Sequence, residues 1–128
     1  MRKQIIASHE APQAIGPYSQ AVRVGDLVFL SGQIPLDPAT GEIVQGDTAE
    51  QTRRVMENLG AVLRAAGADF SEVVRSTVYL VNLADFGKVN EVYGGYFSSE
   101  PPARVTVQVA ALPRGASVEI EMIAHVGA

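Results

Sequence analysis

The sequence predicts an α+β domain in which one mixed β-sheet carries two helices on a single face. Its 128 residues fit one domain, and 47% hydrophobic with 19% charged residues is the composition of an ordinary globular protein. Segments in the core of the chain follow the order strand, helix, strand, helix, strand, strand. Strand–helix–strand units favour parallel pairing through right-handed crossovers, so a sheet with some parallel strands is expected.

The amino-terminal part of the chain predicts short strands and turns. Residues 3–7 form a short candidate strand, and residues 10–20 contain two prolines and a glycine that predict a structured loop. Residues 21–35 predict a β-hairpin whose turn is Gly25-Asp26. The second arm of this hairpin is apolar on both faces, which is typical of a central strand covered on both sides.

Residues 47–67 contain the strongest helix pattern in the sequence. Asp47 or Thr48 can cap its amino terminus, with Glu50 or Gln51 completing a capping box, and Gly67 can end it. Residues 84–97 predict a second, weaker helix, because two adjacent glycines lower its helix propensity. The apolar stripe of the first helix consists of Val55, Leu59, Val62, Leu63 and Ala66.

Three further segments complete the predicted sheet. Residues 72–83 are rich in β-branched side chains, residues 104–109 alternate polar side chains with valines, and residues 117–126 alternate glutamates with apolar side chains. Two helices cannot cover both faces of a sheet of four to six strands, so we expect them on one face. The other face then needs a partner, and a second copy of the same chain is the simplest one.

The composition argues against several classes of function. The chain has no cysteine, which rules out disulfides, a thiol nucleophile and a cysteine-based metal site. A net charge of −4 without a basic stripe argues against nucleic-acid binding. His9 and His125 lie near opposite ends of the sequence, so no metal is expected. Without a membrane-spanning apolar run or a signal-peptide core, the protein is expected to be cytoplasmic.

Three charged residues stand in strands where a purely structural sequence does not need them. Arg104 opens a strand shortly after two prolines, and Glu119 and Glu121 interrupt the apolar last strand. Each has an ordinary alternative, because an arginine at a strand end often forms a surface ion pair and alternating glutamates often mark a wet strand face. A functional alternative is that the arginine grips both oxygens of a carboxylate while a glutamate moves a proton or orients a water.

Other polar residues come from turns and from the second helix. Ser31 and Gly32 end the most apolar strand, Tyr18 follows a rigid Gly-Pro turn, and Asn90 lies one turn before a tyrosine. Each of these residues also has a structural explanation. Ser31 and Gly32 can simply form a turn, Tyr18 can be a core tyrosine with one hydrogen bond, and Asn90 can hydrogen-bond a loop. Together with Arg104 they suit the binding of a small polar acid. There is no glycine-rich phosphate loop and no triad-like histidine, so no nucleotide cofactor and no nucleophilic triad are expected.

Three segments resemble the RidA (YjgF-like) family of reactive enamine/imine deaminases: AIGPYSQAV, LVFLSGQIPLDPATGEI and PPARVTVQVAALPRGASVEIEMIA. The resemblance runs almost end to end, and the P-A-R motif followed by V-E-I-E is specific to that family. It implies that residues 1–128 form a single RidA-like domain with the fold of Bacillus-type chorismate mutase. It also implies a homotrimer with a central barrel, and active sites in clefts between neighbouring subunits.

The resemblance further implies a cofactor-free hydrolase of the 2-iminobutanoate/2-iminopropanoate deaminase type. Such enzymes convert 2-aminoacrylate and related enamine or imine acids to 2-keto acids and ammonia. They thereby remove reactive intermediates that pyridoxal-phosphate enzymes release. An imine carbon is already electrophilic, so the enzyme needs only to hold the carboxylate, place a water and assist proton transfer.

The resemblance assigns a role to each candidate residue. Arg104 binds the substrate carboxylate, helped by the backbone at Gly32. Glu119, the first glutamate of V-E-I-E and therefore preferred over Glu121, positions and activates the attacking water or handles its proton. Thr106 stands where many relatives have a cysteine, so that side chain is not an essential nucleophile, although the backbone carbonyl there can still hold water. The remaining pocket-lining residues are Tyr18, Ser31 and Asn90.

A different class of function stays open at this point. The same pocket can belong to a trimeric binding or regulatory protein that captures small keto acids without turnover. Members of the family have also been linked to RNA cleavage and chaperone-like activity, but the net charge of −4 argues against direct RNA binding.

Overall fold

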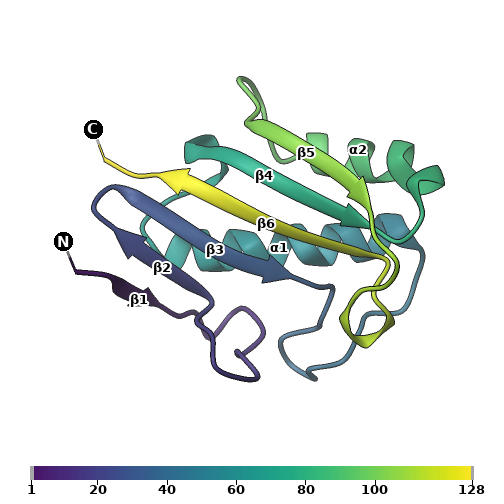
Figure 1. Cartoon of the computed structure of the whole chain (residues 1–128), viewed down its shortest axis with the longest axis horizontal. Helices are drawn as coiled ribbons and strands as arrows, with labels where there is room; N and C mark the ends of the chain where they lie inside the picture. Colours follow the sequence, from purple (N-terminus) through teal and green to yellow (C-terminus); the bar gives the residue numbers. More distant parts are fainter. Residues whose placement is uncertain (1, 128) are drawn as a thin grey trace.

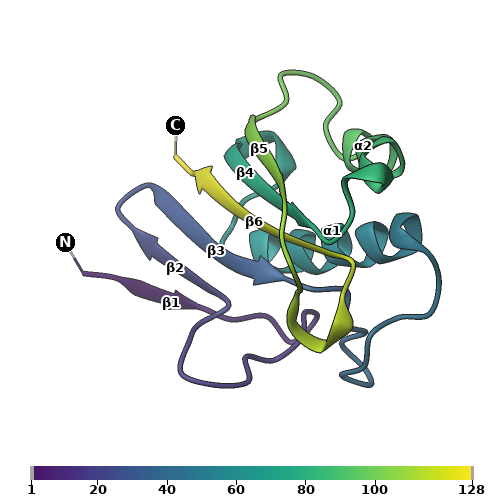
Figure 2. The ribbon, with the colours of Figure 1, turned by 45° about the vertical axis from the view of Figure 1, so that its right-hand side comes forward.

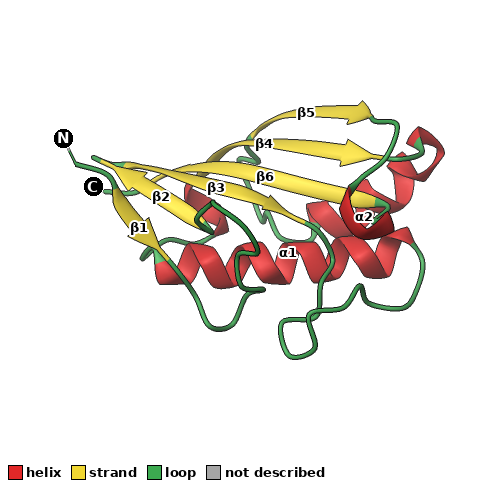
Figure 3. Cartoon of the chain, turned by 60° about the horizontal axis from the view of Figure 1, so that its bottom comes forward, coloured by secondary structure: helices red, strands yellow, loops and turns green. Residues whose placement is uncertain are grey.

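The computed structural model describes residues 2–127 as one six-stranded sheet with two α-helices on one face (Figure 1, Figure 3). The predicted α+β class is therefore confirmed. The strands are β1 (Gln4–Ile6), β2 (Ala21–Val24), β3 (Leu27–Gln33), β4 (Val73–Leu80), β5 (Ala103–Gln108) and β6 (Val118–His125). The α-helices are α1 (Thr48–Ala65) and α2 (Phe86–Gly94), and short 3-10 turns lie at η1 (Phe70–Glu72), η2 (Leu83–Asp85) and η3 (Pro113–Gly115).

The sheet has the strand order β1-β2-β3-β6-β4-β5. β1, β2 and β3 pair antiparallel in sequence order, and β6 lies between β3 and β4, antiparallel to both. β5 pairs parallel with β4, and α2 makes the crossover between them. The expected parallel pairing thus occurs at β4–β5, while the last strand of the chain separates the two ends of the first strand–helix–strand unit.

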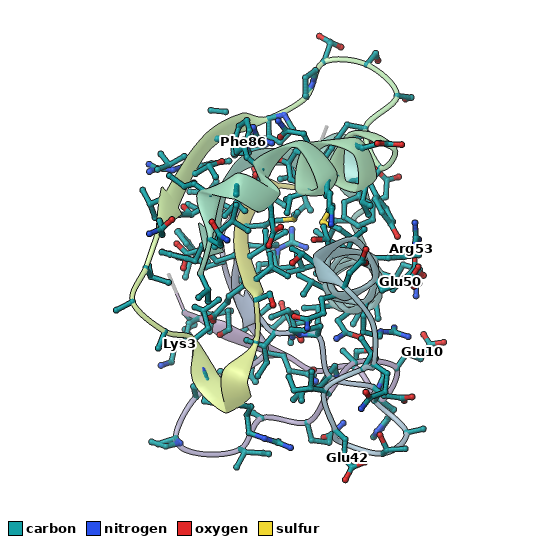
Figure 4. All side chains as sticks on the ribbon, turned by 90° about the vertical axis from the view of Figure 1, so that its right-hand side faces the viewer. Lys3, Glu10, Glu42, Glu50, Arg53 and Phe86 are labelled. Carbon is teal, nitrogen blue, oxygen red and sulfur yellow. The ribbon has the colours of Figure 1, made fainter. Side chains whose placement is uncertain are left out.

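The helix α1 begins and ends where its sequence predicts. The Asp47 carboxylate accepts a hydrogen bond from the Glu50 backbone N–H at 3.1 Å. The Glu50 side chain does not turn back toward the cap, because it accepts a hydrogen bond from the Arg53 guanidinium at 2.9 Å. Figure 4 shows the side chains of Glu50 and Arg53 on the side of α1 away from the sheet. Gly67 follows the helix with φ of +78°, a conformation that favours glycine.

The core lies between α1 and the helix-facing side of the sheet. Val55, Met56 and Leu59 of α1 are fully buried, and the sheet contributes Val28 and Ile120, which are equally buried. Each large apolar side chain buried here contributes about 1.5–3 kcal/mol of transfer free energy. No helix among residues 2–127 is both long and apolar enough to cross a membrane.

The opposite face of the sheet, which we call the open face, carries no helix and looks toward the viewer in Figure 1. It contains apolar side chains with substantial exposure: Leu27 (39%), Phe29 (43%), Val105 (40%) and Val107 (37%). The expectation that the 27–30 strand is covered on both sides is therefore wrong for a single chain. Covering this face requires something outside the chain.

Candidate active site

The candidate residues of the hairpin and the last strand line one pocket of about 640 Å³. Its lining residues come from the end of β3, the loop before β2, the turn η3 and β6. Figure 2 shows where these segments lie in the ribbon. Four sequence-predicted residues line it, namely Tyr18, Ser31, Gly32 and Glu119, and so does Glu121. We call this set of residues the glutamate pocket.

Gly32 and Glu119 are in direct contact. The pairing of β3 with β6 is irregular between Leu30 and Gln33, and Gly32 lies within that irregularity. A Cβ built on Gly32 lies 2.2 Å from Oε2 of Glu119, so any larger residue displaces the carboxylate. Gly32 has no positive φ, which means that its role here is space and not backbone conformation.

The environment of Glu119 favours its protonated form. Burial, followed by repulsion from the nearby Glu121 carboxylate, raises the pKa of Glu119 above its ordinary value of 4.5. The neighbouring Tyr79 hydroxyl donates to Oε2 of Glu121 at 3.3 Å. Within residues 2–127, no hydrogen bond or ion pair engages the Glu119 carboxylate. A half-buried acid of this kind, facing a pocket, suits proton transfer.

Tyr18, from the loop before β2, and Ser31, from the end of β3, present polar groups to the same pocket. The Ser31 hydroxyl donates to the Ser19 carbonyl at 2.6 Å, which leaves its oxygen free to accept from a ligand. The phenol oxygen of Tyr18 accepts from the Ile15 backbone N–H at 3.4 Å, so its own proton stays available. The buried Gln20 side chain holds the loop by donating to the Ser8 and Pro12 carbonyls at 3.2 and 2.6 Å.

Arg104 lies outside this pocket, on the edge strand β5. Its guanidinium carbon is 5.4 Å from the ring centroid of Phe86 and 5.0 Å from that of Tyr93, both on α2. None of the ion pairs among residues 2–127 includes Arg104. The surface ion pair considered for this arginine is therefore absent from the part of the chain that the structure describes.

Asn90 and Thr106 lie beside Arg104. Asn90 is half-buried and stands between Phe86 and Tyr93 on the same face of α2, because residues three or four apart are neighbours on a helix. Thr106 shares the helix-facing side of β5 with Arg104, and its buried hydroxyl oxygen has no hydrogen-bond partner among the described residues. We call Asn90, Arg104 and Thr106 the arginine edge.

The structure therefore divides the predicted site into two parts on opposite faces of the sheet. Glu119 pairs with Tyr79, which pairs with Val107, and these three side chains share the open face. Arg104 pairs with Ser76 and points to the helix side. A small acid in one chain cannot touch both Arg104 and Glu119, since the backbone of the sheet separates them.

The pocket also contains residues that the sequence reasoning did not select. Gln13 and Ile15 come from the loop before β2, and Arg114 comes from η3. Arg114 has φ of +60°, which is unusual for a residue with a side chain, and its guanidinium donates to the Gly41 carbonyl at 3.2 Å. Its place directly before a glycine in a turn was the available signal. Across residues 2–127, no cluster of three or more His, Asp or Glu side chains forms a potential metal site.

Comparison with known proteins gives consistent matches over nearly the whole chain. The family model described as Endoribonuclease L-PSP matches residues 8–126. Protein DfrA of Myxococcus xanthus is 65% identical over 126 residues, which cover 97% of this chain and 96% of that protein. The 2-iminobutanoate/2-iminopropanoate deaminase of Mus musculus is 51% identical over 125 residues, which cover 98% of this chain and 93% of the mouse protein.

A solved structure agrees with these matches. RidA from an Antarctic Psychrobacter species superposes with a TM-score of 0.93 at 46% identity, and the match covers 96% of this chain and 99% of that one. The fold expected from the P-A-R and V-E-I-E motifs, with its mixed sheet and two helices on one face, is thereby confirmed. Motifs, fold and full-length similarity lead to the same assignment, and the chain belongs to the RidA (YjgF-like) family, whose model carries the description Endoribonuclease L-PSP.

Proposed function

We propose that this protein hydrolyses small imine acids, and the enamines that tautomerise to them, to 2-keto acids and ammonia without a cofactor. The observation that carries the proposal is the Glu119 carboxylate, which is half-buried, has a raised pKa and faces the pocket without a hydrogen bond among the described residues. Relatives about half identical to this chain are named 2-iminobutanoate/2-iminopropanoate deaminases, which supports the same reaction class.

The proposed chemistry is addition of water followed by loss of ammonia. Glu119 accepts a proton from water as the water oxygen bonds to the carbon of the protonated imine, which gives a neutral carbinolamine. The same carboxyl group then returns this proton to the nitrogen. The C–N bond breaks to release ammonia while the hydroxyl group gives its proton to the Glu119 carboxylate and the carbonyl forms. A carboxyl group with a raised pKa suits both steps because it exchanges its proton more readily near neutral pH. Ser31 and Tyr18 supply hydrogen bonds that orient the substrate.

Arg104 binds the substrate carboxylate in this proposal, and it does so from a neighbouring subunit. The open face leaves Phe29, Val105 and Val107 exposed, and a homotrimer that packs these faces into a central barrel would cover them. In such an assembly the arginine edge of one subunit meets the glutamate pocket of the next. The division of the site between two sheet faces supports this arrangement, because one chain cannot complete the site alone.

The activity is tested by generating 2-aminoacrylate with a serine dehydratase and following pyruvate release. The wild-type protein is expected to accelerate release, and Arg104→Ala is expected to lose most of that acceleration through a higher KM. If wild type and Arg104→Ala behave alike, the role of Arg104 in carboxylate binding is wrong. If neither accelerates release, but calorimetry shows keto-acid binding, the protein is a binding or regulatory protein without turnover.

The shared site is tested by mixing two impaired variants, Arg104→Ala and Glu119→Ala, through joint refolding. When the two residues come from different subunits, about one quarter of the sites in a random mixture regain both native side chains. Activity then rises above that of either variant alone. When both residues act from one chain, every chain carries one defect and no activity returns.

The description of the family model suggests RNA cleavage as another candidate activity. Against it stands the net charge of −4, because phosphate backbones are bound chiefly by clustered Lys and Arg side chains. A preparation free of contaminating nuclease that cleaves RNA, and loses this activity in Glu119→Ala, would restore that candidate.

A further inference from the structure

The guanidinium of Arg104 is held by aromatic rings in place of a protein carboxylate. Its central carbon lies 5.0 Å from the Tyr93 ring centroid and 5.4 Å from the Phe86 ring centroid, within the range of cation–π attraction. An arginine of this kind usually has an acidic partner, yet none of the ion pairs among residues 2–127 includes it. Within residues 2–127 no ion pair engages this guanidinium, and both rings lie within cation–π distance of it.

The Tyr93 ring is itself fixed from two sides. Its hydroxyl shares a hydrogen bond with the hydroxyl of Ser76, and both residues are almost fully buried, with 5% and 1% exposure. Its ring also packs against Phe97, with the two centroids 4.8 Å apart. Ser76 is the register partner of Arg104 on the neighbouring strand, so the same strand pair sets both the arginine and the anchor of the ring.

Phe86 approaches Arg104 from the start of α2. Its side chain lies where α2 runs close to β5 (Figure 4), and 38% of it remains exposed. Since Phe86 is partly exposed, exchanging it for another apolar residue disturbs the core less than a change at Tyr93. It is therefore the better position at which to test the contact with Arg104.

Stacking on aromatic rings has a specific consequence for an arginine. A ring that packs against the face of a planar guanidinium leaves its five N–H donors unobstructed, because these donors lie in the plane and point outward from its edge. A protein carboxylate would occupy those donors, but the rings leave them free for a ligand carboxylate, which needs two parallel N–H donors. The rings also limit rotation of the long side chain, so less conformational entropy is lost when the ligand binds.

We propose that Phe86 and Tyr93 form an aromatic clamp that positions Arg104 for bidentate binding of the substrate carboxylate, with Ser76 as the anchor of the clamp. This inference rests on the proposed function, since it assigns positioning residues to the same site. None of the three residues touches the substrate in this arrangement. Their effect is on the affinity for the carboxylate, through the orientation of one guanidinium.

The test compares Phe86→Leu with Phe86→Trp in the 2-aminoacrylate assay. Leucine keeps the apolar volume but removes the aromatic face, so KM is expected to rise about five- to tenfold while kcat stays within about twofold. Tryptophan keeps an aromatic face and is expected to retain the wild-type KM. Phe70→Leu is the matched control, because Phe70 packs against Tyr96 and Phe97 and makes no contact with Arg104 among those described.

A double-mutant cycle separates positioning from general destabilisation. In the Arg104→Ala background, Phe86→Leu is expected to cause no further loss of kcat/KM, since there is no guanidinium left to position. An equal loss in both backgrounds, or an unchanged KM in Phe86→Leu, overturns the clamp. If Phe86→Leu fails to fold, Tyr93→Phe enters the same cycle, with an expected rise in KM of about two- to threefold. If Arg104→Ala is as active as the wild type, Arg104 does not bind the substrate carboxylate and the clamp is overturned with it. The proposed function fails in a different outcome, in which the wild type does not accelerate pyruvate release.

Discussion

Replacing Gly32 with alanine is expected to separate activity from stability. The added Cβ would lie 2.2 Å from Oε2 of Glu119, whereas ordinary contact begins at 3.4 Å. The carboxylate must therefore move by roughly 1 Å, and a misplacement of that size at a reacting group costs about a hundredfold in rate. The moving atom is the end of a flexible side chain, so the free energy of unfolding is expected to fall by only about 0.5–1.5 kcal/mol.

The assay follows pyruvate release from 2-aminoacrylate and, in parallel, unfolding by denaturant. Gly94→Ala is the matched control, because a Cβ at Gly94 meets no atom within 4 Å, and wild-type activity is expected there. Glu119→Ala gives the activity that remains without the carboxylate. Should Gly32→Ala keep activity within about threefold of the wild type while Glu119→Ala is inactive, the reasoning that the rate depends on the position of this carboxylate is refuted.

Three further predictions follow from the same structure. Glu121 repulsion contributes to the raised pKa of Glu119, so Glu121→Gln is expected to move the acidic limb of the kcat/KM pH profile to lower pH; an unmoved limb contradicts this. Because the folded-state pKa of Glu119 is raised, ionising this group opposes folding. The contribution of Glu119 to the free energy of unfolding is therefore fully present below its ordinary pKa of 4.5 and is lost as pH rises through the folded-state pKa. In thermal unfolding, Glu119→Gln is expected to be more stable than the wild type at pH 7 but not at pH 4. Phe29→Asp places a charge on the open face. In light scattering the wild type is expected to have three times the 13.6 kDa mass of the chain, and the variant is expected to have the mass of one chain and no activity; an active monomer would contradict the shared site.

The sequence predicted most secondary structure because local signals there agree with the tertiary contacts. The stripe from Val55 to Ala66 matches the buried face of α1, and Asp47 and Gly67 mark its two ends. In β5, alternation separated Arg104 and Thr106 from the valines, and the structure keeps that separation. Such patterns can be recognised in the sequence because side-chain direction repeats with a fixed period along a helix and along a strand.

Some features could not be read in this way. The insertion of β6 between β3 and β4 depends on pairing between segments far apart in sequence. Alternation separated two faces of β5 but did not say which one meets the helices, and the valines proved to lie on the open face. The aromatic clamp was equally hidden, because Phe86 and Tyr93 have the spacing of an ordinary apolar helix stripe.

The sequence by itself determined the family, the α+β class and the chemical inventory of the site, since motifs and residue types are local properties. Only the tertiary structure decided how that inventory is distributed. It placed Glu119 against Gly32 on the open face and Arg104 near the rings of Phe86 and Tyr93 on the helix side. The physical reason is that a sheet turns successive side chains to opposite faces, while strand order and register, which arise from long-range pairing, decide which residues meet there.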